Sequence, residues 1–103
     1  MPWLRVEIVG FVDESNPGFV RCAFTDADGE RHTFVEKIPV VTTQDLWSDS
    51  VYPQEGAVPC LSVEPVNDEV HRRTVRVTLN LLDFDSLQIP DSYVVLESQL
   101  SND

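Results

Sequence analysis

Residues 19–37 read FVRCAFTDADGERHTFVEK, and this stretch decides the fold. Apolar and polar side chains alternate on both sides of Asp28-Gly29, which is the period-two pattern of half-buried β-strands. A short Asp-Gly loop between two such runs predicts a hairpin with a three-residue loop and with Gly29 in the left-handed region. The predicted cross-strand pairs are Asp26 with Glu30, Phe24 with His32, Cys22 with Phe34 and Val20 with Glu36.

The same alternation predicts further strands on either side of this hairpin. They cover approximately residues 3–12, 57–66, 70–82 and 93–97, and the predicted hairpin between the second and third of these places Glu64 opposite Arg72. Pro59 and Pro65 indicate an edge or a bulge in the 57–66 strand. The tail, residues 98–103, is expected to fray.

About six strands in 103 residues indicate a single all-β domain over residues 1–103. We expect a small antiparallel barrel, because closure removes exposed sheet edges, with a two-sheet β-sandwich as the alternative. Residues 38–56 form one long irregular loop in this prediction, since Pro39 and Pro53 remove backbone donors. This loop holds at most one helical turn, with Thr43 as its N-cap. Such long loops are often functional.

The charge balance limits the choice of partners. The chain has 18 Asp and Glu against 7 Lys and Arg, a formal net charge of −11. Nucleic acids and anionic membrane surfaces would repel it, so another protein is the expected partner. The N-terminus has no features of a secretory signal, and the two cysteines, Cys22 and Cys60, are expected to be buried and reduced. We therefore predict a cytoplasmic location.

Chemistry-bearing motifs are sparse in this sequence. Cys22, His32, Cys60 and His71 are the soft metal ligands, and they lack the paired spacing of a zinc site. The acidic stretch that begins at Asp83 lacks the spacing of a calcium loop. No nucleophile motif and no phosphate-binding loop is found. The sequence therefore predicts no cofactor and no metal, and favours a protein that is not an enzyme.

The candidate binding residues come from three places in the chain. The long loop carries two aromatic residues, either of which can anchor a partner if it stays exposed. A basic concentration at residues 71–76 places two arginines on one face, where they either dock an acidic partner or pair with acids on the neighbouring strand. The hairpin strand offers a histidine and a glutamate at a barrel mouth. These candidates are Trp47, Tyr52, Arg72, Arg76, His32 and Glu36.

Two segments carry a resemblance. Residues 32–41 read HTFVEKIPVV and residues 52–60 read YPQEGAVPC, and with these the chain resembles a group of short bacterial proteins of unknown function over residues 3–97. The resemblance implies a bacterial, cytosolic origin. The expected architecture is also similar to the small six-stranded barrels found as accessory domains in translation GTPases, a likeness of fold alone.

Three functions remain open at this point. The favoured one is a non-catalytic protein-interaction module, because a rigid β scaffold carries one long loop with aromatic residues. The first alternative is an acidic protein that neutralises a basic partner, either as a toxin-immunity protein or as a mimic of nucleic-acid charge. The second is a ligand-binding or enzymatic barrel that uses His32, Glu36 or Cys60 at its mouth. The sequence leaves the oligomeric state open.

Overall fold

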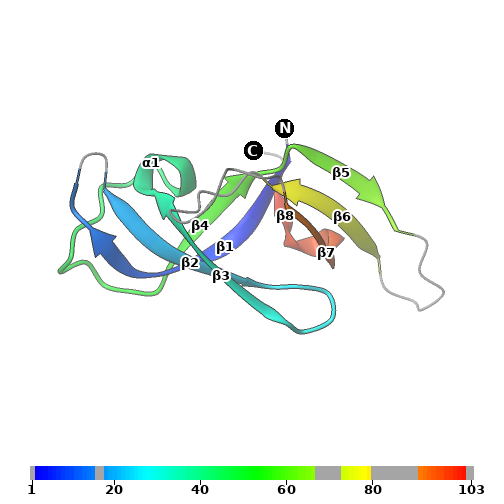
Figure 1. Cartoon of the computed structure of the whole chain (residues 1–103), viewed down its shortest axis with the longest axis horizontal. Coiled ribbons are helices and arrows are strands. Elements are labelled where there is room, and N and C mark those ends of the chain that lie inside the picture. Colours follow the sequence, from blue (N-terminus) through cyan, green and yellow to red (C-terminus); the bar gives the residue numbers. More distant parts are fainter. Residues whose placement is uncertain (1, 16–17, 67–72, 80–90, 102–103) are drawn as a thin grey trace.

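The computed structural model describes residues 2–15, 18–66, 73–79 and 91–101, which form a mostly β structure with two antiparallel sheets. The larger sheet contains β1 (Trp3–Asp13), β2 (Phe19–Thr25), β3 (Arg31–Lys37), β4 (Gln54–Pro59) and β8 (Leu100–Ser101). The smaller sheet contains β5 (Ser62–Pro65), β6 (Thr74–Leu79) and β7 (Asp91–Leu96). One helical turn, α1 (Ile38–Val41), and one 3-10 turn, η1 (Glu97–Gln99), complete the described elements. The two sheets follow one another along the 45 Å long axis of the molecule (Figure 1).

The central hairpin forms as the sequence predicts. The register of β2 and β3 pairs Val20 with Glu36, Cys22 with Phe34 and Phe24 with His32. Gly29 has a φ of 86°, and the N–H of Asp26 donates to the carbonyl of Glu30 at 2.9 Å. The turn chemistry and the alternation are therefore sufficient to predict the register of this hairpin.

The described strands do not close into the barrel that the sequence favoured. The larger sheet has the order β3-β2-β1-β4, with β8 also paired to β1, and the smaller sheet has the order β5-β6-β7. Among the described residues, no strand of one sheet is paired with a strand of the other. Alternation identifies strands, but it does not specify which edges meet.

The predicted strand over residues 57–66 is in fact two strands in different sheets. The N–H of Cys60 donates to the carbonyl of Pro2 beside the larger sheet, at 3.0 Å. The next N–H, that of Leu61, donates to the carbonyl of Thr78 in the smaller sheet, at 2.7 Å. The chain thus changes sheets between these two residues, just after Pro59, which ends β4.

The predicted register of the following hairpin is wrong by four residues. Glu64 lies opposite Arg76, and not opposite Arg72. A shift by an even number leaves the same side chains on each face, so an acid still faces a base across the two strands. Loop length fixes register in a hairpin. The prediction assumed a short turn at Asn67-Asp68-Glu69, whereas the observed pairing places Val66 opposite Thr74 and so leaves a longer connection.

Two further predictions are corrected at the ends of the larger sheet. The helical turn begins at Ile38, with Lys37 as its N-cap, and not at Thr43. Proline is favoured in the first turn of a helix, where it has no N–H to satisfy, and Pro39 occupies such a position. The tail does not fray at residue 98, because β8 pairs with the start of β1.

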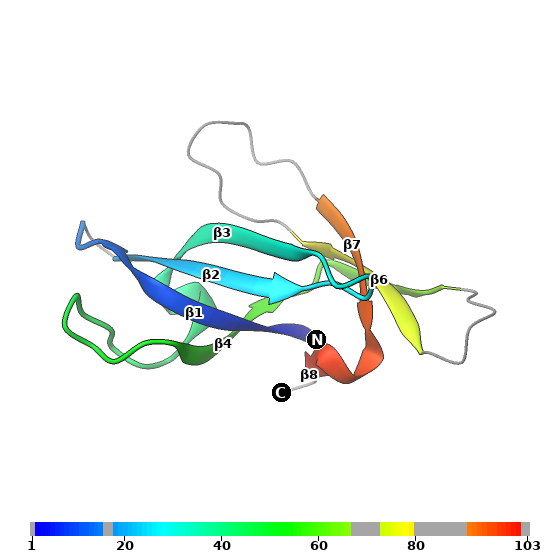
Figure 2. The same cartoon turned by 90° about the horizontal axis from the view of Figure 1, so that it is seen from below.

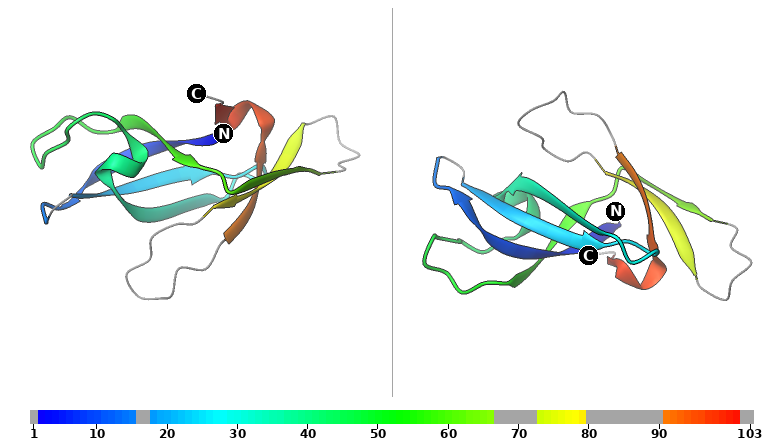
Figure 3. Two further views of the ribbon diagram at one scale, coloured as in Figure 1. Left: turned by 90° about the horizontal axis from the view of Figure 1, so that it is seen from above. Right: turned by 60° about the horizontal axis from the view of Figure 1, so that its bottom comes forward.

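A single hydrophobic core contains side chains from both sheets. Its fully buried members include Leu4 and Ile8 of β1, Val20 of β2, and Val77 of β6. The tip of the β2–β3 hairpin lies beside β7 (Figures 2 and 3), and the N–H of Ala27 donates to the carbonyl of Val94 at 2.9 Å. Apolar packing and this hydrogen bond together fix the smaller sheet against the larger one.

Candidate functional site

The most exposed large apolar side chains of the described residues include two from one loop. We call residues 42–53, between α1 and β4, the Trp47 loop. The exposed fraction is 64% for Trp47 and 81% for Val51. A large exposed aromatic side chain such as that of Trp47 is a candidate anchor for a partner.

The loop is held in place by hydrogen bonds around Trp47. The N–H of Trp47 donates to Ser50 Oγ at 2.9 Å, and the N–H of Ser50 donates to the carbonyl of Trp47 at 3.1 Å. The hydroxyl of Tyr52 donates to the same carbonyl at 2.7 Å. Leu46, the residue directly before Trp47, is buried in the core and anchors this part of the loop. An exposed indole on an ordered backbone loses little conformational entropy when it binds.

The two aromatic residues predicted from the sequence therefore have different roles. Tyr52 packs against the core and ties down the loop, whereas Trp47 projects into solvent. Beside Trp47 lies a hollow of about 110 Å³, and its lining residues are Phe11, Glu14, Gly18, Ile38, Asp45 and Leu46. Its lining is mostly apolar and includes two carboxylates, those of Glu14 and Asp45.

Carboxylates are frequent on the two segments that line this hollow, and two of them, Glu14 and Asp45, are among its lining residues. Asp13 ends β1 and Glu14 follows it, while Asp45 and Asp49 lie in the Trp47 loop. All four are exposed. The N–H and the hydroxyl of Ser15 lower the pKa of Asp13 below its usual value, so this carboxyl stays ionised. The Trp47 loop contains no lysine or arginine. The surface is thus an apolar patch with an acidic rim.

His32 lies far from this patch, at the other end of β3. Its Nε2 is 2.8 Å from Asp26 Oδ2, and its ring contacts Tyr93 edge-on at a centroid distance of 4.8 Å. The hydrogen bond from His32, followed by that from the N–H of Glu30, lowers the pKa of Asp26. The structure therefore places His32 in a cluster at the hairpin tip.

Glu36 and Cys60 do not join His32 in one site. His32 and Glu36 are four residues apart on β3, about 13 Å along a strand. The exposed fraction is 5% for Glu36 and 2% for Cys60, and burial raises the pKa of the Cys60 thiol. The strand thus keeps His32 and Glu36 apart, and a buried thiol whose pKa is raised, such as that of Cys60, is not activated as a nucleophile.

One of the two arginine candidates, Arg76, belongs to the smaller sheet. Arg76 is exposed on β6 and has Glu64 opposite it on β5. Arg72 lies outside the described residues. The placement of Arg76 agrees with the interpretation of a cross-strand pair of opposite charges.

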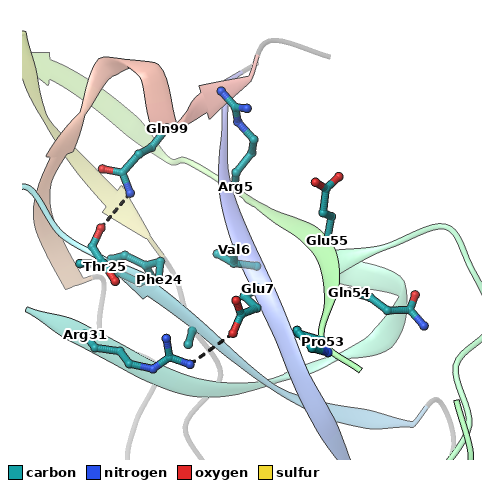
Figure 4. A pocket seen from close by; sticks show the side chains of 12 residues that line it. Arg5, Val6, Glu7, Phe24, Thr25, Arg31, Pro53, Gln54, Glu55 and Gln99 are labelled. Atoms are coloured by element: carbon teal, nitrogen blue, oxygen red, sulfur yellow. Dashed lines mark hydrogen bonds and ion pairs between the residues drawn. The ribbon is translucent and has the colours of Figure 1, made fainter. Parts of the chain in front are cut away.

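A second hollow, of about 430 Å³, lies on the outer face of the larger sheet (Figure 4). Its charged lining residues are Arg5, Glu7, Arg31 and Glu55, two of each sign. Arg31 Nη2 is 3.4 Å from Glu7 Oε1, and both side chains are about half exposed. Balanced and solvated charges give this hollow little preference for a charged ligand.

Two features of these candidate sites are not predicted from the sequence. Val51 was not singled out, because one valine in an irregular segment carries no periodic signal. Asp26 and Glu30 were treated as turn residues only, although the predicted register already placed Asp26 on the same face as His32. That shared face was a signal for the cluster at the hairpin tip.

Comparisons with protein-family models, with curated proteins and with solved structures gave no match. Within the described ranges, no helix is long and apolar enough to cross a bilayer.

Proposed function

We propose that this chain is a protein-interaction module that binds its partner through Trp47. The proposal rests mainly on one observation: an indole that is 64% exposed stands on a loop whose backbone is fixed by hydrogen bonds. Tryptophan is strongly enriched among the residues that dominate binding free energy at protein interfaces. Exposure of such a residue is unfavourable unless a partner covers it.

The acidic rim indicates what kind of partner fits. Glu14, Asp45 and Asp49 present negative charge around Trp47, and the whole chain has a net charge of −11. A complementary surface has an apolar pocket for the indole and lysine or arginine side chains around it. We therefore propose a basic protein surface as the partner.

The alternative function, an acidic protein that neutralises a basic partner, differs from this proposal in the force that drives binding. If charge alone holds the partner, binding falls steeply with added salt and depends little on Trp47. If the indole anchors the partner, salt slows association, while truncation of Trp47 speeds dissociation. The two mechanisms can thus be separated by one kinetic experiment.

The test compares three versions of the full chain. Immobilised wild-type protein captures partners from a lysate of its source organism, and each recovered partner is purified and titrated against Trp47→Ala and Leu61→Ala. Leu61 is the matched control, because it is apolar and 55% exposed but lies at the start of the smaller sheet.

The expected result is selective loss of affinity. Trp47→Ala weakens binding by about 30-fold, the equivalent of ~2 kcal/mol, whereas Leu61→Ala leaves the affinity unchanged. Asp45→Asn combined with Asp49→Asn slows association at low salt. The proposal fails if Trp47→Ala and Leu61→Ala bind every recovered partner as tightly as the wild type.

A further inference from the structure

The tip of the β2–β3 hairpin brings three potential metal ligands together. One ligand atom each from Asp26, Glu30 and His32 lies within 4.8 Å of the other two. We propose that this cluster is a binding site for one divalent transition-metal ion, independent of the Trp47 loop.

The backbone of the turn holds Asp26 ready for such an ion. Its Oδ1 accepts the N–H groups of Asp28 at 2.9 Å and Glu30 at 3.0 Å. These bonds leave the second oxygen, Oδ2, directed at His32 Nε2. The side chain of Asp26 is 13% exposed, so a ligand atom is held in a fixed place near the surface. Such support of a metal-binding carboxylate raises affinity because it reduces the cost of ordering the site.

The imidazole is also fixed in orientation. The ring of His32 packs at 5.2 Å from Phe24 and at 4.8 Å from Tyr93, measured between ring centroids. Its side chain remains 25% exposed. The ring therefore keeps one edge toward Asp26 while solvent still reaches the site.

The distances fit a metal ion with small adjustments. In a tetrahedral site with bonds of 2.0–2.1 Å, neighbouring ligand atoms are about 3.3–3.4 Å apart. The present separation between Asp26 Oδ2 and His32 Nε2 is 2.8 Å. The two ligand atoms must therefore move apart by about 0.5 Å to hold an ion. Glu30 is exposed and can turn its carboxylate toward both. An ion would take the place of the proton that Asp26 and His32 share.

The donor set selects the type of ion. One imidazole nitrogen with two carboxylates suits zinc, nickel, copper or cobalt, in which water completes the coordination. Calcium prefers six to eight oxygen ligands, and this cluster does not supply them. The alternative role of the Asp26–His32 contact is to close the turn without any ion, and the experiment must separate the two.

The experiment titrates the full metal-free chain with zinc chloride, followed by calorimetry, and with cobalt(II) chloride, followed by visible absorption. We expect saturable binding of one ion per chain, with cobalt bands that report nitrogen and oxygen ligands. Zinc should shift the NMR amide signals of residues 26–32. His32→Gln weakens binding at least tenfold, and Glu30→Gln weakens it several-fold.

The control is the other histidine of the chain. His71→Gln should bind zinc as the wild type does. Circular dichroism checks that each variant is folded, and the exposed Glu30→Gln variant keeps the test valid if His32→Gln unfolds. Absence of binding by the wild type, equal binding by all variants, or loss of binding in His71→Gln alone would each overturn the proposal.

Discussion

The side-chain amide of Gln99 donates a hydrogen bond of 2.8 Å to the backbone carbonyl of Thr25, 74 residues earlier in the chain (Figure 4). The other end of the same amide, Oε1, accepts the N–H of Leu96 at 2.8 Å. Thr25 ends β2 in the larger sheet, and Leu96 ends β7 in the smaller sheet. One side chain thus connects the two sheets.

Removal of this link should destabilise the fold. We expect Gln99→Ala to lower the free energy of unfolding by about 1–2 kcal/mol, because two hydrogen bonds are lost. Urea unfolding at neutral pH measures the change. Ser98→Ala, in the same turn and exposed, is the control. Equal stability of the two variants would contradict the role of Gln99.

The turn of the central hairpin depends on the positive φ of Gly29. Open space surrounds this glycine, so a substitution there tests backbone strain and not packing. We expect Gly29→Ala to cost about 1 kcal/mol of unfolding free energy, and Gly29→Asn to cost less, since asparagine tolerates the left-handed region. Thermal unfolding of the two variants compares the costs. A larger cost for asparagine would exclude strain as the cause.

The close packing of β4 against Ile8 and Val41 depends on Gly56. A Cβ at this position would lie 2.9 Å from the side chain of Ile8 and 3.0 Å from the carbonyl oxygen of Val41. We expect Gly56→Ala to cost about 1–3 kcal/mol, because the backbone at Val41 must shift. Gly10→Ala in β1 is the matched control, since no atom lies within 4 Å of its added Cβ. Urea midpoints that are equal for the two variants would count against this explanation.

The stability should depend on alkaline pH through Cys22. Burial, with a smaller contribution from Glu36, raises the pKa of this thiol from its usual 9.0 to about 12. The folded chain therefore keeps the proton longer than the unfolded chain, and the stabilisation is complete below pH 9 and is lost as the pH rises toward 12. Between pH 8 and 10.5, the free energy of unfolding should fall by about 2 kcal/mol more in the wild type than in Cys22→Ala. Urea unfolding at both values measures this difference, and parallel pH profiles would refute the prediction.

Local chemistry explains which parts of the fold could be predicted. The hairpin from Phe19 to Lys37 has a defined loop and clear alternation on both sides, and its register is correct pair by pair. The strand that contains Pro59 was predicted as continuous, because alternation persists through Cys60 while the chain changes sheets. The prediction of a closed barrel was wrong for a similar reason, because the pairing of sheet edges depends on contacts between residues that are distant in sequence.

The candidate site residues also differ in how well local sequence predicts their surroundings. Trp47 stood out because tryptophan in an irregular acidic segment has no strand face to occupy, and it is exposed in the structure. Glu36 was grouped with His32 by residue type, yet the strand between them separates the two by about 13 Å. For Asp26, Glu30 and His32, the predicted register already gave the shared face, and the structure adds the distances between their ligand atoms.

The burial of both native sulfurs makes the wild-type chain a convenient background for spectroscopy. Cys22 is fully buried and Cys60 is 2% exposed, and the chain contains no other cysteine. A cysteine introduced at the exposed Ser48, next to Trp47, would react with maleimide reagents at neutral pH while the native thiols stay protected. A dye or a nitroxide can therefore be attached beside the indole while both native cysteines stay in place.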